Sequence, residues 1–598
     1  MPSTENPTEE TAPAQTGKRP RRIRYDLGVL FAYLLGALGL TARLWIDLDN
    51  RVLASFPPDQ YLFEFFLSHS ARVVTHLENP LFTNQLNFPD GVNVMANTAT
   101  FAITIPLIPV TMAFGPHVSF AVMVTLAPFL TAFGWYMLFS RKLVESRLAA
   151  AIGGAFCGFA PGIVAQDNVH PNLAMHFVVP FIIWQVLRLR EGANPVRTGL
   201  LLSALIVYQF FINEEILLFT ALGLLGFTGI WALYNKAEAK RVLKRFVGGL
   251  AVAAVVSFAL LAYPMWFQFF GPQHYHGFGD FVHLFGADVY SFTAFPTHSL
   301  GGSPDSVLLA NNVVEETTFF GWPLMVMSVV WAAMLWRRTD VKAATITAAA
   351  FAVASLGSHL HIGGQLTKIP APWYLFAKLP LLDSVIASRL TLVMIPWFGM
   401  LIALVLARIL RADNTVGAAS RMRIFMLAGV AVALIPLIPT PLGAVHRPAV
   451  PSFITSGEWK TYVDDQHSLV LLPVPYASVG IAAVQWNAAA RAEFAITGGY
   501  FLVPNPDTPD DEGMFGPPLR PTSKIFYKMA TDGKTTVITD KERADAIVDL
   551  KFWKAGAVVL SPNEKKAAQY KATMVDLLGV EPEWKGGVWL WDVRELTR

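Results

Sequence analysis

Acidic and histidine side chains gather in polar segments that flank long apolar stretches of this chain. Asp59 follows Pro57 and Pro58 and precedes the apolar stretch 61–67. A carboxylate beside a membrane surface can remove a proton from a hydroxyl group or bind a divalent cation. Asp is also a favoured N-cap residue, so the residues alone leave open a capping role for Asp59.

Two short polar turns carry further groups of the same kind. One contains Asp167 and His170, and the other contains Glu214 and Glu215. A carboxylate and a histidine together suit a metal ion or a phosphate-bearing substrate, although Asp is also an ordinary turn former. A divalent ion such as Mg²⁺, Mn²⁺ or Ca²⁺, held by Asp59, Asp167 and His170, is therefore one expectation, and metal dependence stays open.

Three charged residues precede the later apolar stretches. Glu315 and Glu316 either line a cavity or complement the dipole of the helix that follows them. Arg389 lies at the start of another apolar stretch, and its planar fork of donors matches phosphate oxygens. Snorkelling to the interface or pairing with Asp383 would also explain Arg389. We rank Arg389 first among the phosphate-binding candidates.

These residues must be positioned by apolar helices. A bilayer core of about 30 Å needs roughly 20 apolar residues per helix. About eleven stretches approach this length, near residues 27–46, 118–139, 148–165, 173–189, 198–212, 216–234, 246–270, 318–336, 342–357, 391–410 and 424–440. The runs of Lys and Arg between them all fall on one side, which the positive-inside rule assigns to the cytoplasm.

One further apolar stretch, 98–114, would reverse that alternation if it crossed the membrane. We expect it to be a re-entrant or interfacial helix on the outer side, broken by Pro106 and Pro109. The N-terminus is then cytoplasmic and the C-terminus extracytoplasmic. Residues 1–24 are Pro-, Thr- and Glu-rich and then basic, and we expect them to form a disordered cytoplasmic tail.

Composition supports a polytopic α-helical membrane protein, since 54% of the residues are hydrophobic and only 15% are charged. The positive charges are segregated between the spans, which indicates topology and argues against nucleic-acid binding. The single cysteine, Cys157, lies in an apolar stretch, so no intramolecular disulfide is expected.

The expected organisation is a transmembrane domain at 25–444 and an extracytoplasmic α/β domain at 445–598. Three outer loops, at 47–97, 271–317 and 358–390, are too long to be simple connections. In the C-terminal part, short apolar runs predict strands at 469–474, 557–560 and 588–591, with a helix at 565–578.

With this architecture and several short motifs, the sequence resembles the bacterial members of the GT-C class of membrane glycosyltransferases. Asn79-Pro80 and the later Pro89-Asp90-Gly91-Val92-Asn93 look like the N-P and P-x-G-x-N segments of that class. Leu379-Pro380, followed by Arg389, is similar to the Leu-Pro and Arg segment that GT-C members carry before a late membrane span. Asp47 and Asp49 have Asp-x-Asp spacing but lie directly at the end of the first span, unlike the branches that carry this motif in the loop.

The resemblance implies transfer of a sugar, with inversion, from a polyprenyl-phosphate donor to a glycan, lipid or protein acceptor of the cell envelope. Asp59 would be the general base, and Arg389 would hold the phosphate with Lys378 or a divalent ion. Loop 271–317 would close over the donor, and the C-terminal domain would orient the acceptor. The implied location is the bacterial cytoplasmic membrane. A lipid or solute transporter or flippase, or a non-catalytic scaffold of the same fold, are the alternatives.

Overall fold

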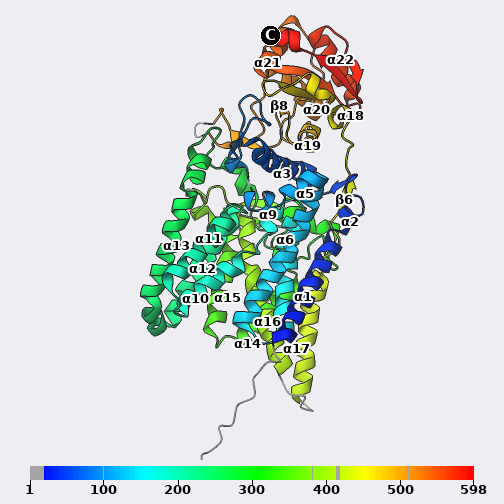
Figure 1. Cartoon of the computed structure of the whole chain (residues 1–598). Coiled ribbons are helices and arrows are strands. Elements are labelled where there is room, and N and C mark those ends of the chain that lie inside the picture. The colour runs from blue at the N-terminus through cyan, green and yellow to red at the C-terminus, as the bar shows by residue number, and fades with distance from the viewer. Residues whose placement is uncertain (1–18, 99, 380, 412–417, 509–510) are drawn as a thin grey trace, which may run out of the picture.

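The helices of this chain form an elongated bundle with a small sheet at one end (Figure 1). The computed structural model describes residues 19–98, 100–379, 381–411, 418–508 and 511–598. The first helix, α1, begins at the far end of the bundle, whereas the C-terminal residues belong to the sheet region (Figure 1).

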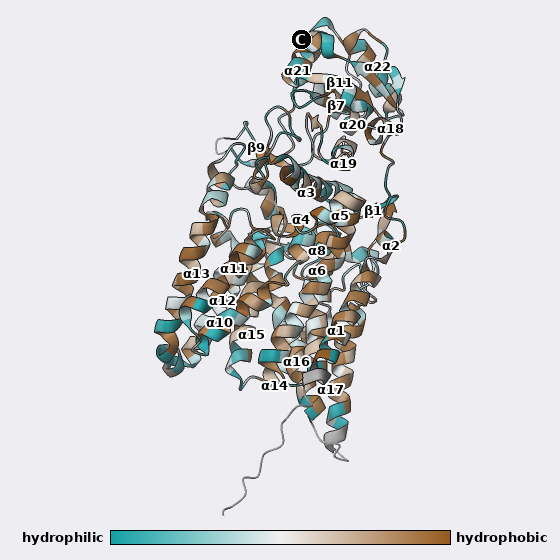
Figure 2. Ribbon diagram, in the orientation of Figure 1, coloured by the Kyte–Doolittle hydropathy of each residue, from teal (hydrophilic) through white to brown (hydrophobic). Residues whose placement is uncertain are grey.

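Among the described residues, six helical segments are long and apolar enough to cross a membrane, and a seventh results if one bent pair counts as a single span. Hydrophobic residues follow these helices along their length (Figure 2). The six segments involve α1 (Arg19–Leu40), α6 (Pro116–Leu138), α9 (Pro171–Ala174) with α10 (Val179–Arg190), α12 (Glu214–Tyr234), α13 (Lys236–Phe270), and the 3₁₀ helix η8 (Ala387–Val393) with α16 (Met394–Arg411).

The bent pair consists of α7 (Arg147–Phe159) and α8 (Pro161–Asp167), which meet at 42°. The remaining apolar stretches form the shorter helices α11 (Pro195–Phe210), α14 (Trp322–Met334), α15 (Thr339–Ala354) and α17 (Ala418–Leu434). Each of the eleven predicted stretches thus contains a helix, but the count of eleven spans is not confirmed.

The expected boundary of the N-terminal tail is wrong. Residues 1–18 lie outside the described part of the chain, but α1 already begins at Arg19, so 19–24 are helical instead of disordered. Arg is a good helix former, and the basic residues therefore extend the apolar helix beyond its apolar part.

Ion pairs show that the basic runs from different loops meet at one end of the bundle. Asp26 of α1 pairs with both Arg141 and Arg147. Further pairs at this end join loops that are distant in the sequence: Lys142–Glu191, Arg190–Glu238 and Arg411–Glu145. The positively charged ends that the sequence placed on one side therefore lie together in space, at the end opposite the sheet (Figure 1).

Small residues bring α7 and α16 into close contact. A Cβ at Gly153 would lie 2.7 Å from the carbonyl oxygen of Gly399, and a Cβ at Gly399 would lie 2.3 Å from Sγ of Cys157. Such close approach of backbones is typical of helices that pack within membranes. It fixes α8, which continues α7, relative to η8, which precedes α16.

At the sheet end, short elements cover the tops of the membrane helices. Stretch 98–114 forms two short helices, α4 (Phe101–Thr104) and α5 (Ile108–Phe114), with Pro106 between them as expected. The expected break at Pro109 is wrong, because Pro109 lies in the first turn of α5, where proline is tolerated. The longer helix α3 (Pro57–His76) lies between the bundle and the sheet region (Figure 1). Other elements here are α2 (Ala42–Trp45), β1 (Arg51–Leu53), β2 (Phe82–Thr83), β3 (Val92–Asn93), β4 (His359–Ile362), β5 (Gln365–Pro370) and β6 (Ala444–His446).

The C-terminal part contains a mixed five-stranded sheet in the order β12-β13-β11-β7-β8. Strand β7 is parallel to β11 and β8, and β13 is antiparallel to β11 and β12. The predicted strands and helix are present as β7 (Ser468–Leu472), β11 (Ala555–Leu560), β13 (Val588–Asp592) and α22 (Ala567–Leu578). Elements that we did not predict include α19 (Ala482–Ala489), β8 (Ala495–Ile496), β9 (Leu502–Pro504), β10 (Gly513–Phe515), α20 (Pro521–Asp532), α21 (Asp540–Phe552) and β12 (Glu583–Lys585).

Both faces of this sheet are buried. Side chains of a strand alternate between the faces, so Val470 and Val558 pack among residues of α20, α21 and α22. Leu469 and Val559 belong instead to the large core that also includes the membrane helices and α3. The sheet is therefore joined to the rest of the molecule by a continuous apolar core.

Candidate functional site

Asp59 lies in the first turn of α3 and faces His170. Helix α3 begins at Pro57, and its N-cap position is Phe56, which makes no side-chain capping bond. Oδ2 of Asp59 lies 2.9 Å from Nε2 of His170, which follows α8. The capping role that the sequence left open for Asp59 is therefore wrong, since its carboxylate is directed at a second chemically active side chain.

His170 is held on both sides of its ring. Nδ1 lies 3.3 Å from Oε1 of Gln166, while Nε2 meets the Asp59 carboxylate. The amide of Gln166 is oriented by Nε2, which donates to the carbonyl oxygen of Val314 at 2.9 Å and to Glu315 at 3.3 Å. Both ring nitrogens of His170 thus face acceptors, and both bonds form when the ring carries two protons.

Arg389 lies between two carboxylates. Its Nε donates to both carboxylate oxygens of Glu315 at 3.1 Å, and Nη1 donates to Glu215 at 3.1 Å. Nη2 also donates to Glu315. All three groups are largely buried, and their formal charges sum to one negative unit. Neither snorkelling nor pairing with Asp383 accounts for Arg389 in this structure.

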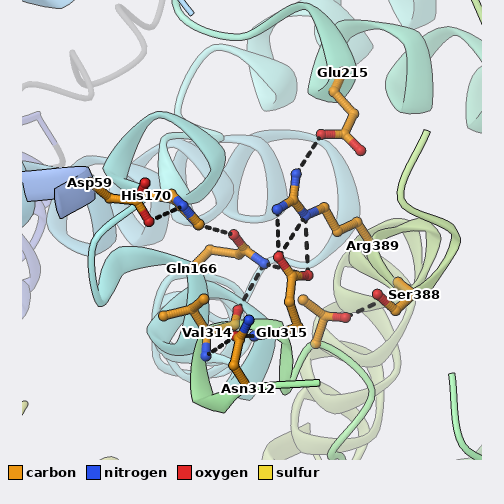
Figure 3. A network of polar contacts seen from close by, with 10 residues as sticks. Asp59, Gln166, His170, Glu215, Asn312, Val314, Glu315, Ser388 and Arg389 are labelled. Atoms are coloured by element: carbon orange, nitrogen blue, oxygen red, sulfur yellow. Dashed lines mark hydrogen bonds and ion pairs between the residues drawn. The ribbon is translucent and has the colours of Figure 1, made fainter. Parts of the chain in front are cut away.

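These contacts form one continuous polar chain at the sheet end of the membrane helices (Figure 3). It runs from Asp59 through His170, Gln166 and Glu315 to Arg389 and ends at Glu215. Its members come from α3, α8 and the turn after it, the segment before α14, η8 and the start of α12. Six side chains from five separate parts of the sequence thus share one site.

The neighbouring acidic residues point elsewhere. Glu214 accepts a hydrogen bond from Gln268 at 3.0 Å, so it does not join the Arg389 cluster. Glu316 accepts bonds from the backbone N–H and the hydroxyl of Thr297. Burial raises the pKa of Glu316 to about 7, although the two bonds from Thr297 oppose this shift. Helix α14 begins only at Trp322, so the expected helix-dipole role of Glu315 and Glu316 is wrong.

Asp167 is fully buried at the end of α8, and neither of its carboxylate oxygens has a hydrogen-bond partner in the described structure. Oε1 of Glu215 is also buried without a partner there. Oxygen atoms of this kind suit a hard divalent cation. However, within the described ranges no three His, Cys, Asp or Glu side chains come together as a metal site, so the ligand set Asp59, Asp167 and His170 is not assembled.

Lys378 is exposed, and no ion pair of this residue occurs in the described part of the chain. It belongs to the segment that precedes Arg389, but it is not part of the polar chain. Its contact with a donor phosphate stays a prediction.

Tyr500 is a site residue that the sequence did not reveal. Its hydroxyl hydrogen-bonds Asp59, and burial together with the Asp59 charge raises its pKa above the ordinary value. The ring stacks on Phe515 with 5.5 Å between centroids and meets Phe56 edge-on. The C-terminal part thus supplies a donor to Asp59. The sequence could not indicate this role, because Tyr500 is a single tyrosine outside any motif.

A large apolar cavity lies among the membrane helices beside this site. Its volume is about 700 Å³, within the range of small-molecule sites. At one end it is lined by Ile216 and Leu392, which closely follow Glu215 and Arg389 in the chain. At the other end it reaches Arg190 and Asp340 in the basic loops. An apolar chain attached to a charged head group therefore has room beside Arg389.

Comparison with known proteins gives weak structural likenesses only. No family model matches the chain, and no curated protein matches it. Among solved structures, it is similar to the oligosaccharyltransferase AglB from Archaeoglobus fulgidus in complex with an inhibitory peptide and a dolichol-phosphate, with 13% identity and a TM-score of 0.49. That match covers 93% of this chain and 71% of AglB.

A second similar structure is ArnT from Cupriavidus metallidurans bound to undecaprenyl phosphate, with 11% identity, a TM-score of 0.44, and coverage of 96% of this chain and 98% of ArnT. Both neighbours are GT-C glycosyltransferases, the class that the motifs of this sequence resemble. With TM-scores below 0.5, these likenesses carry no argument about what this chain does.

Proposed function

We propose that this chain is a membrane glycosyltransferase that moves a sugar from a polyprenyl-phosphate donor to an acceptor of the cell envelope. The observation that carries the proposal is the polar chain between Asp59 and Arg389 at the sheet end of the apolar helices. It places a candidate base and a candidate phosphate ligand in one connected site. The proposed location is the bacterial cytoplasmic membrane, with this site on the outer side and the N-terminus in the cytoplasm.

The proposed reaction is a single displacement. Asp59 accepts the proton of the acceptor hydroxyl while the oxygen of that hydroxyl forms a bond to the anomeric carbon of the sugar. The bond from that carbon to the phosphate oxygen breaks on the opposite face, and polyprenyl phosphate leaves with the electron pair. The configuration at the anomeric carbon is therefore inverted. Tyr500 and His170 hold the Asp59 carboxylate in place through their hydrogen bonds.

Arg389 can contact the leaving phosphate without giving up its carboxylate partners. A guanidinium has five N–H donors, and the bonds to Glu315 and Glu215 engage three of them. The other two remain for phosphate oxygens. Because the cluster has a net negative charge, a bound phosphate needs a further positive charge, and Lys378 is the proposed source. The apolar cavity beside Leu392 would take part of the polyprenyl chain.

The test uses Asp59→Asn in the full-length protein, reconstituted with polyprenyl-phosphate monosaccharides whose sugar is radiolabelled. The amide keeps the size of the side chain but cannot accept the proton, so transfer should fall by about 10²- to 10⁴-fold. Binding of undecaprenyl phosphate, measured by native mass spectrometry, should persist. Asp49→Asn is the matched control, because Asp49 lies at the same end with an 85% exposed side chain. Full transfer by Asp59→Asn would contradict the assignment of the base.

The cavity also favours a second candidate function, a lipid transporter, because it extends from Ile216 and Leu392, near the site, to the basic end of the bundle. Movement of a lipid across the bilayer needs no base at Asp59. The reconstituted wild type and Asp59→Asn can be compared in a lipid scrambling or flipping assay. Equal rates of lipid movement in the two proteins, without sugar transfer by either, would favour this alternative.

A further inference from the structure

The segment between α15 and η8 presents an unusual surface. Its strands β4 and β5 form a hairpin in which His361 opposes Leu366. The turn consists of Gly363 and Gly364, both with positive φ, as a tight two-residue hairpin requires. Every described residue of β5 except the half-buried Thr367 is exposed.

Large apolar side chains dominate this surface. Leu375, in the 3₁₀ helix η7 (Pro372–Leu375), is 76% exposed. The other exposed apolar residues of the segment are Ile362, Leu366, Ile369, Tyr374, Phe376, Leu379 and Leu381. Proteins in water rarely expose so many large apolar side chains together. We call this surface, formed by the exposed residues of 362–381 apart from residue 380, the apolar hairpin surface.

Its charges have one sign. Residues 362–381 contain no Asp or Glu, whereas Lys368 and Lys378 are both exposed. A surface that combines exposed Leu, Ile, Phe and Tyr side chains with lysines suits the boundary between acyl chains and anionic head groups. A protein partner would need an acidic surface of matching shape, whereas a bilayer around the apolar helices would end next to this surface.

The hairpin is tied to loop 271–317. The N–H of Gly364 donates to Asp288 at 2.8 Å, and the N–H of Val289 donates to the carbonyl oxygen of His361 at 3.0 Å. Helix α15 leads into β4 from the basic end, and η8 with Arg389 follows the segment. The surface therefore lies at the outer ends of two apolar helices.

We propose that the apolar hairpin surface inserts into the outer leaflet of the bilayer, with Lys368 on anionic head groups. Leu375, Phe376 and Leu379 lie among the acyl chains, and the hairpin is fixed at the interface. This inference does not depend on a glycosyltransferase activity, because it rests on exposure and charge alone. It places the segment that precedes Arg389 in contact with lipid.

The test uses the full-length protein in lipid nanodiscs with a single environment-sensitive NBD label. Cys157 is the only cysteine and is buried, so a Cys157→Ala background permits Leu375→Cys labelling. Val537→Cys is the matched control, since Val537 is 82% exposed but lies in the C-terminal part. We expect the label at Leu375 to show blue-shifted emission. Lipids that carry a doxyl group near the head group should also quench it strongly. The label at Val537 should show neither effect.

Two results would overturn the insertion into the bilayer. One is a label at Leu375 that reports water, as the label at Val537 does. The other is a shielded label that doxyl lipids do not quench, which would mean that protein covers the surface. Nanodiscs of phosphatidylcholine with and without phosphatidylglycerol test the charge: quenching should deepen with the anionic lipid, and Lys368→Gln should remove the difference. Equal quenching in both discs would refute the contact with anionic head groups.

Discussion

Arg389 combines a proposed ligand role with an evident structural one. Its guanidinium is enclosed by Glu315 and Glu215, so Arg389→Ala leaves two carboxylates without their positive partner. Breaking a buried ion pair in this way costs about 3–5 kcal/mol. We expect Arg389→Ala to lower the melting temperature strongly, and Arg389→Lys to lower it less because the charge remains.

A double variant separates the two roles. In Arg389→Gln/Glu315→Gln one unpaired carboxylate is removed with the guanidinium, so much of the lost thermal stability should return. Binding of undecaprenyl phosphate should remain roughly ten- to a hundredfold weaker than in wild type if Arg389 contacts the phosphate. Wild-type binding by a well-folded double variant would leave Arg389 with a structural role only.

Tyr500 is proposed as a positioning residue for Asp59. Tyr500→Phe keeps the stacked ring but removes the hydroxyl that donates to the carboxylate. Loss of the hydroxyl leaves the carboxylate less firmly oriented, so kcat for sugar transfer should fall while KM for the donor stays the same. Steady-state kinetics of transfer measure both constants. Tyr527→Phe, which removes a hydroxyl elsewhere in the C-terminal part, should leave both unchanged, and a wild-type kcat in Tyr500→Phe would refute the role.

At the scale of elements, Glu316 links the end of loop 271–317, just before α14, to Thr297 in the middle of the same loop. Burial raises its pKa to about 7 from 4.5, so the folded protein binds more protons than the unfolded chain between these values. Its contribution to the free energy of unfolding therefore falls as pH rises from about 4.5 to about 7 and is constant above that.

Glu316→Gln should weaken this pH dependence, because the amide does not titrate and can still bond Thr297. Melting temperatures in one detergent at pH 5 and pH 8 measure the effect. We expect the decrease between the two values to be smaller in Glu316→Gln than in wild type. Glu145→Gln, with an 89% exposed side chain, is the control. Identical decreases in wild type and Glu316→Gln would contradict the prediction.

At the scale of the whole molecule, the bundle has a basic end and a sheet end. The positive-inside rule assigns the basic end to the cytoplasm, so the two ends should lie on opposite sides of the membrane. A reporter after Arg598 should be extracytoplasmic, and one inserted at Gly192, between α10 and α11, should be cytoplasmic. Alkaline phosphatase and fluorescent protein fusions distinguish the sides, and two reporters on one side would refute this topology.

The sequence by itself determined where the helices and several strands lie. Apolar length and the position of basic runs are local properties, so each predicted apolar stretch contains a helix, and the basic loops meet through ion pairs such as that of Asp26 with Arg141. Strands β7, β11 and β13 were predicted for the same reason. The boundary of α1 was missed because charged residues can extend an apolar helix.

Only the tertiary structure decided which side chains meet. Asp59 and His170 are 111 residues apart, and Arg389 is 74 residues from Glu315 and 174 from Glu215. All five residues were candidates from the sequence. However, Arg389 was expected to contact Asp383 or phosphate, and Asp59 was left as a possible helix cap. Tyr500 was not predicted. Such pairings depend on how α3, α8, η8 and α12 pack, and this depends on close contacts such as Gly153 with Gly399 that no local pattern encodes.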